Sequence, residues 1–171
     1  MTQIKLLDTI QPQQVLLVFL DSNGVFSTIA YPQASETVAS GINNNGEIVG
    51  TYDGASGFIY INGSYTTIMP PPGSFSFQVN GVNNEGQIVG SYQGSGGQLG
   101  FVLTASGYTT LSDPLATNGT YATGINDAEE VVGYYIDEGR TFGFIYNNGI
   151  YTTINSPPGG AFANNPIKWC E

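Results

Sequence analysis

Short apolar runs separated by glycine, asparagine and proline dominate this chain. The runs are rich in Ile, Val, Phe, Tyr and Thr, which are the residues that favour extended backbone. Nowhere do apolar residues recur at i, i+3, i+4 and i+7 over about ten residues, the spacing of an amphipathic helix. The pattern therefore predicts an all-β protein built from short strands.

One motif occurs three times, about 40 residues apart. It begins at Gly41, Gly81 and Gly124 and reads GINNNGEIVGTY, GVNNEGQIVGSY and GINDAEEVVGYY. Each copy is followed by an aromatic and aliphatic run (GFIYI, GFVLT or GFIYN) and then by YTTI or YTTL. Asparagine and glycine between the runs supply the positive φ angles of tight antiparallel hairpins. Each unit is predicted to be a four-stranded antiparallel meander, with strands a, b, c and d in chain order.

A period of about 40 residues with four strands per unit is typical of a β-propeller. The b and c strands are apolar on both faces, which suggests that neighbouring sheets cover each sheet on both sides. Both ends of the chain hold parts of a further unit: Gln3 begins a strand b, residues 15–29 form c and d, and the segment from Phe162 to Trp169 forms a. We predict a single domain, a four-bladed propeller closed by pairing of the N- and C-terminal strands. Its blades are residues 3–29 plus 162–169, 37–70, 77–112 and 120–155.

This topology sorts the connections into two ends. The a-b and c-d hairpins are alike in all units and lie at the end that we call the bottom. The b-c and d-a connections vary between units and lie at the top. Variable loops on a rigid scaffold commonly carry binding sites, so we expect the site at the top. The top loops are residues 53–57, 70–76, 93–100, 112–120 and 136–143.

The motifs GINNxGxIVGxY, GFxY and YTTI, the last followed by a turn with Pro and Gly, resemble the HAF-repeat family of bacterial tandem repeats. The resemblance covers about residues 15 to 160 and implies a β-repeat architecture and an extracellular location, with no single activity. Members of that family usually carry His before the GF dipeptide. This chain has Ser56, Leu99 and Phe142 there, so no role of that His is carried over.

Charge and composition exclude several classes of function. Three Lys and Arg residues against thirteen Asp and Glu give a net charge of -10, so nucleic acid and anionic membrane surfaces are not expected partners. The absence of His excludes Ser-His-Asp and Cys-His nucleophiles and His-ligated zinc or haem. The single cysteine, Cys170, cannot form an internal disulfide. The chain has no stretch that could span a membrane and no secretory signal, so we expect it to be soluble. We also expect it to need no cofactor.

Tyrosines provide the first candidate binding residues. Aromatic faces beside Asn, Gln and Ser can stack on sugars while the phenol supplies a hydrogen bond. The alternative is that they pack between blades as part of the repeat. The tyrosines that follow the b strands, and are expected at the top rim, are Tyr52, Tyr92, Tyr134 and Tyr135.

The third repeat contributes the candidate chemistry. Asp137, Glu138 and Arg140 lie in its b-c loop and are candidates for ligand binding or for acid and base catalysis. The alternative is a solvated loop with an ion pair of little energetic value. A glycosidase would need two carboxylates about 5 to 10 Å apart, for which Asp137 with Asp113 or Asp53 are candidates.

Two further groups lie in the bottom hairpins. Asp127, Glu129 and Glu130 lack the alternating pattern of a calcium loop, so no metal site is predicted. A second set of residues is expected to cap the hairpins through local hydrogen bonds. The alternative is that these residues line the mouth of a channel. This set is Asn43, Asn83 and Asn126, with Trp169 at the equivalent place in the fourth blade.

The leading functional hypothesis is a non-catalytic binding module for a small polar molecule or glycan. One alternative is an isomerase, cyclase or hydrolase with an axial pocket that uses carboxylates and tyrosine. The other is a structural or protein-interaction scaffold.

Overall fold

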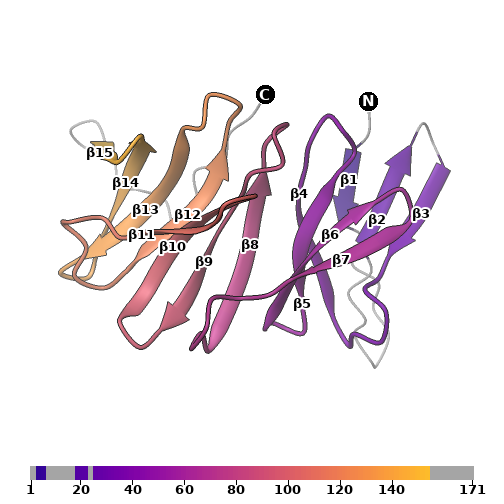
Figure 1. The fold of residues 1–171 in the computed structure, drawn as a ribbon, viewed down its shortest axis with the longest axis horizontal. Helices are drawn as coiled ribbons and strands as arrows, with labels where there is room; N and C mark the ends of the chain where they lie inside the picture. Colours follow the sequence, from indigo (N-terminus) through magenta and orange to yellow (C-terminus); the bar gives the residue numbers. More distant parts are fainter. Residues whose placement is uncertain (1–2, 7–17, 23–24, 155–171) are drawn as a thin grey trace.

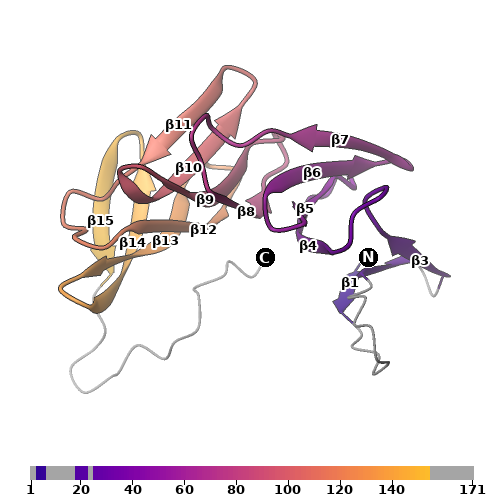
Figure 2. The same cartoon turned by 90° about the horizontal axis from the view of Figure 1, so that it is seen from below.

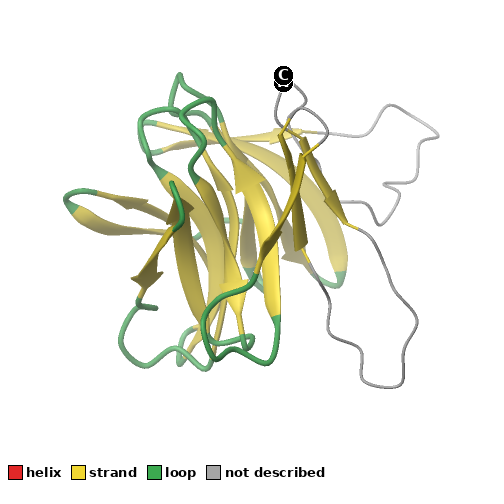
Figure 3. Ribbon diagram, turned by 90° about the vertical axis from the view of Figure 1, so that its right-hand side faces the viewer, coloured by secondary structure: helices red, strands yellow, loops and turns green. Residues whose placement is uncertain are grey.

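The computed structural model describes residues 3–6, 18–22 and 25–154, and all regular elements in these ranges are β-strands (Figures 1 and 3). The first sheet contains β1 (Gln3–Leu6), β2 (Val18–Ser22) and β3 (Val25–Ile29). The second contains β4 (Thr37–Ile42), β5 (Ile48–Tyr52), β6 (Ser56–Ile61) and β7 (Ser64–Ile68). The third contains β8 (Ser76–Val82), β9 (Ile88–Gly94), β10 (Gly97–Thr104) and β11 (Gly107–Leu111). The fourth contains β12 (Thr120–Ile125), β13 (Val131–Asp137), β14 (Arg140–Asn147) and β15 (Ile150–Ile154).

The predicted meanders are confirmed. The second, third and fourth sheets are four-stranded and antiparallel, with their strands adjacent in chain order. The first sheet contains the predicted strands b, c and d: Gln3 pairs with Asp21, and Val18 pairs with Ile29. The strand predicted for residues 162–169, which would add strand a and close the ring, lies outside the described residues.

The sheets follow one another along an arc, each covering a face of the next (Figure 2). Strands β4, β8 and β12 lie side by side along its inner side, whereas β7 and β11 lie outside. Three apolar clusters fill the spaces between sheets. The cluster of the first and second sheets is built on Ile29 and Phe58, that of the second and third on Ile68 and Phe101, and that of the third and fourth on Leu111 and Phe144.

A glycine on each b strand makes room for the buried phenylalanine of the GF dipeptide. A Cβ placed on Gly90 would overlap the carbonyl oxygen of Gln78 and lie 2.7 Å from the Phe101 ring. Gly50 and Gly133 are enclosed in the same way by their own phenylalanines. Dense packing of this kind leaves no space for a methyl group, which explains why these positions repeat as glycine.

A tyrosine on each d strand connects neighbouring sheets. The backbone N–H of Ala30 donates to the Tyr65 hydroxyl at 3.0 Å, and the Tyr108 hydroxyl donates to the Met69 carbonyl at 2.7 Å. The backbone of Ser112 lies beside Tyr151 at the equivalent place, where it acts to lower the pKa of the Tyr151 phenol against the larger effect of burial. The tyrosine of YTT therefore holds the connection that leaves the preceding sheet.

Candidate functional site

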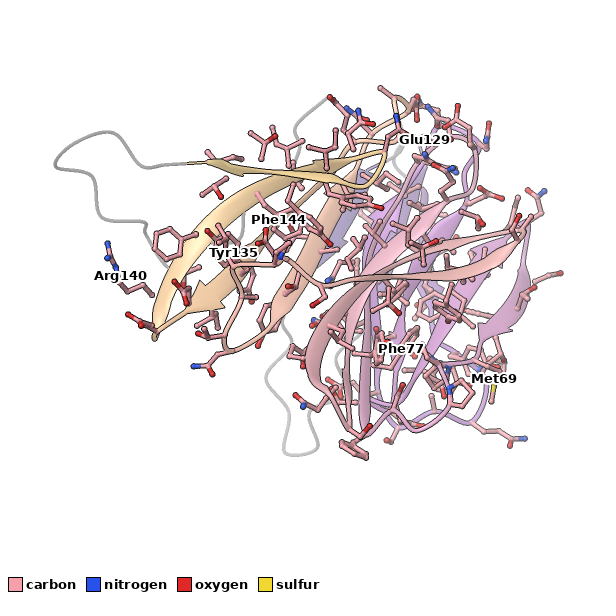
Figure 4. The ribbon with its side chains drawn as sticks, turned by 60° about the vertical axis from the view of Figure 1, so that its left-hand side comes forward. Met69, Phe77, Glu129, Tyr135, Arg140 and Phe144 are labelled. Atoms are coloured by element: carbon pink, nitrogen blue, oxygen red, sulfur yellow. The ribbon has the colours of Figure 1, made fainter. Side chains whose placement is uncertain are left out.

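The charged loop of the third repeat is a solvent-exposed hairpin. Asp137 lies opposite Arg140 in the register of β13 and β14, and Glu138 occupies the turn with φ of 47°. Arg140 lies at the tip of this hairpin and extends away from the sheet, with its Cζ 5.3 Å from the Phe142 ring centroid (Figure 4). No group of three or more potential metal ligands occurs among the described residues. Glu138 and Arg140 are exposed and Asp137 is half-buried, and none of the three lines either of the two cavities described below.

Three of the candidate tyrosines pack against the protein itself. The Tyr52 ring stacks on Tyr31 of the preceding connection, with centroids 3.8 Å apart. Tyr92 packs against the cluster of the second and third sheets, and its hydroxyl lies 3.1 Å from the Thr110 hydroxyl. Tyr135 is 3% exposed, so it has no open ring face to offer a ligand. These contacts agree with the alternative interpretation, in which the tyrosines pack as part of the repeat.

The fourth candidate, Tyr134, faces the other side of its sheet. Successive side chains of a strand point to opposite faces, and Tyr135 belongs to the cluster shared with the third sheet. Tyr134 therefore points away from the third sheet, where it stacks on Tyr121 with centroids 4.5 Å apart. Burial raises the pKa of the Tyr134 phenol.

The carboxylates considered for a glycosidase come from three different sheets or their connections. Asp113 is 3% exposed, with Oδ1 accepting a hydrogen bond from the Leu115 N–H and Oδ2 without a partner. Asp53 and Asp137 lie at the tips of two separate top hairpins. Neither of the two cavities described below is lined by more than one of these three groups.

The inner strands carry the feature that sequence reasoning missed. Each has an irregularity, a β-bulge, where the pairing shifts by one residue: at Ser40 in β4, at Asn80 in β8 and at Thr123 in β12. A bulge turns its extra residue out of the regular alternation and bends the strand. The signal was present, because these three positions differ between repeats while the glycine after each is the same.

Those glycines let the inner strands approach one another. A Cβ on Gly41 would lie 3.1 Å from the Cα of Gly81, and a Cβ on Gly81 would lie 3.6 Å from the Cα of Gly124. Three strands thus meet backbone to backbone at one level of the arc. Larger residues here would force the sheets apart.

An open cavity of about 330 Å³ lies along this meeting of strands, and we call it the axial cavity. The bulge residues Ser40, Asn80 and Thr123 line it together with the ends of β4, β8 and β12. Its lining combines hydroxyl, amide and backbone groups with aliphatic side chains. The latter are Ile42, Val82 and Ile125.

A ladder of asparagines forms the bottom rim of the axial cavity. The Asn43 side-chain amide donates to the Asn83 carbonyl at 2.9 Å, and that of Asn83 donates to the Asn126 carbonyl at 3.2 Å. Each asparagine also caps its own hairpin: Asn43 Oδ1, for example, accepts from the N–H groups of Asn45 and Glu47. The predicted capping by these asparagines is therefore confirmed, and the three side chains also line the axial cavity.

A second cavity, of about 240 Å³, lies between β4 and β8 and opens toward the top; we call it the inter-sheet cleft. The exposed carboxylates of Glu36 and Asp53 line it together with the buried residues Thr51 and Phe77. Ser40 lines both this cleft and the axial cavity. The two spaces therefore adjoin at the bulge of β4.

Comparison of the chain with protein-family models, curated proteins and solved structures finds no match. Within the described ranges no helix is long or apolar enough to cross a membrane.

Proposed function

We propose that this chain is a non-catalytic binding module for a small polar or carbohydrate-like molecule. The observation that carries the proposal is the axial cavity, where three sheets each contribute one polar bulge residue beside aliphatic side chains. Its volume lies at the lower end of small-molecule sites, which span about 300 to 1,000 Å³. Hydroxyl and amide groups spaced around a partly apolar wall suit the alternating polar and C–H surfaces of a sugar.

This proposal moves the expected site from the top rim to the axis. The rings of the rim tyrosines pack against other side chains of the protein. Glu138 and Arg140 are exposed on one hairpin, beside the half-buried Asp137. General acid and base catalysis depends on groups held against the substrate and tuned by burial. Because neither cavity holds such a set with Asp137, the enzyme alternative has less support than binding.

We also propose that the sheets belong to a closed four-bladed propeller. On the second sheet, Val49, Ile59 and Ile68 pack into the cluster shared with the third sheet. The fourth sheet carries Val132, Ile145 and Ile154 at the equivalent positions, on the face that points away from the third sheet. Such an apolar face favours a further packed sheet.

The first sheet carries an exposed aromatic side chain that could pack against the fourth sheet in such a ring. Phe26 occupies the position of the connecting tyrosines Tyr65 and Tyr108, and it is 55% exposed. In a closed ring Phe26 would cover the connection that leaves β15. We retain the likeness to HAF repeats as part of this proposal, on the repeated motifs alone.

Thermal-shift measurements on the full chain against a panel of monosaccharides, disaccharides and polyols, together with a glycan array, test the binding proposal. A ligand should raise the melting temperature in proportion to the logarithm of its concentration. Ser40→Ala removes a hydroxyl from the cavity wall and should weaken binding several-fold. Ser64→Ala removes an exposed hydroxyl of β7 and should leave binding unchanged. Absence of any stabilising ligand, or equal binding by both variants, would contradict the proposal.

A further inference from the structure

The two interfaces between the inner strands differ at their bulge residues. Asn80, at the bulge of β8, spans to the fourth sheet by donating to the Ala122 carbonyl at 2.7 Å. Ser40 occupies the same place in β4, where the equivalent acceptor is the Val79 carbonyl. The Ser40 side chain makes no hydrogen bond among the described residues, and the second and third sheets are joined nearby by the Val79 N–H, which donates to Thr51 Oγ1 at 3.1 Å. Ser40 lines both the inter-sheet cleft and the axial cavity, so the two spaces adjoin at this residue.

The top of the cleft carries negative charge on two side chains. Asp53 Oδ1 accepts hydrogen bonds from the Ser35 N–H at 2.8 Å, the Ser35 hydroxyl at 2.6 Å and the Glu36 N–H at 3.2 Å. The Ser35 hydroxyl is the main reason that the pKa of Asp53 lies below its usual value, so this carboxylate is ionised at neutral pH. Asp53 Oδ2 and the Glu36 carboxylate have no partner among the described residues.

Nothing described in the protein neutralises these two carboxylates. Of the chain's three Lys and Arg residues, only Arg140 has a described side chain, and it lies at a hairpin tip of the fourth sheet. No group of three or more potential metal ligands occurs in the described ranges. An ammonium group on a partly apolar molecule fits these carboxylates, because the cleft also offers the half-buried side chain of Val38.

We propose that the ligand is an amino-substituted polyol, of which an amino sugar is the simplest example. Its ammonium group lies at Glu36 and Asp53, and its neutral hydroxylated body extends past Ser40 into the axial cavity. This inference rests on the proposed binding function and adds the charge of the ligand and its orientation. A neutral sugar would leave the two carboxylates unpaired, so it should bind more weakly.

The test compares sugars that share one ring and differ at a single substituent. Glucosamine, N-acetylglucosamine and glucose, with chitosan and chitin oligosaccharides as longer members, are titrated into the full chain by calorimetry at low and high salt. We expect the amine-bearing members to bind at least about tenfold more tightly than their neutral counterparts, with the difference reduced by salt. Ethanolamine, which has the amine without the ring, should bind more weakly than glucosamine.

Two variants locate the site. Glu36→Gln removes one charge from the cleft and should reduce the preference for the amine several-fold, whereas Glu85→Gln removes an exposed charge from a bottom hairpin and should not. Ser40→Asn places the longer side chain of Asn80 at the junction and should abolish binding without lowering the melting temperature.

The outcomes separate the two proposals. Neutral sugars that bind as tightly as amino sugars, with no effect of Glu36→Gln, would overturn this inference and leave the binding function in place. Ethanolamine binding as tightly as glucosamine would overturn the position assigned to the ring. If no member of either series binds, the binding function and this inference fail together.

Discussion

Replacing Asn83 by alanine should destabilise the protein more than the same change at the equivalent Asn126. Asn83 is 3% exposed, and its side chain makes three hydrogen bonds. Two join it to Gln87 in its own hairpin, at 2.7 and 2.8 Å, and the third reaches the Asn126 carbonyl in the fourth sheet. Asn126 also makes three side-chain bonds, and those described all lie within its own hairpin.

The magnitude follows from these bonds. Each contributes about 0.5 to 1.5 kcal/mol net, and an alanine leaves the Gln87 N–H without its acceptor in an enclosed site. Asn83→Ala should therefore cost about 2 to 4 kcal/mol of unfolding free energy. Asn126 is half-buried and water can replace more of its bonds, so Asn126→Ala should cost about 1 to 2 kcal/mol.

Urea unfolding of the two variants and the parent, followed by far-UV circular dichroism, measures the difference. The variant Asn83→Asp tests the hydrogen bond between the sheets separately, because the aspartate keeps an acceptor for the Gln87 N–H but cannot donate to the Asn126 carbonyl. This variant should be at least as unstable as Asn83→Ala, since a buried carboxylate would face a carbonyl oxygen. If Asn83→Ala lies within about 0.5 kcal/mol of the parent, or Asn126→Ala is the more damaging, the ladder does not hold the sheets together.

Two further predictions concern ring closure and alkaline pH. Removing residues 162–171 should lower the free energy of unfolding by several kcal/mol, because it deletes the strand proposed to close the ring. Removing only residues 170–171 should leave the melting temperature unchanged. If both truncated chains melt like the full chain, the proposed closure is wrong. Burial raises the pKa of Tyr108 and of Tyr151 to about 12, above the value near 10 of an unfolded tyrosine. Their contribution to stability is complete below pH 10 and is lost as pH rises toward 12, so melting temperatures should fall over that interval and less steeply in Tyr108→Phe.

The sequence alone was sufficient for the strands, their order and their hairpins. These depend on local chemistry: β-branched and aromatic runs favour extended backbone, and Asn-Gly pairs such as Asn62-Gly63 adopt the positive φ angles of the turns. Even the partial first sheet followed from alignment of the repeats, because Gln3 and its neighbours match the b strand of the later units.

Only the tertiary structure decided what the side chains do between sheets. Tyr134 and Tyr135 are adjacent and chemically identical, yet one lies in a core cluster and the other faces away, because the position of the neighbouring sheet distinguishes the two faces. The bulges at Ser40, Asn80 and Thr123 appear only as variable positions in the repeat, since a shift in pairing depends on the partner strand. The two cavities also depend on the packing of whole sheets, because each is lined by side chains from more than one sheet and Ser40 lines both.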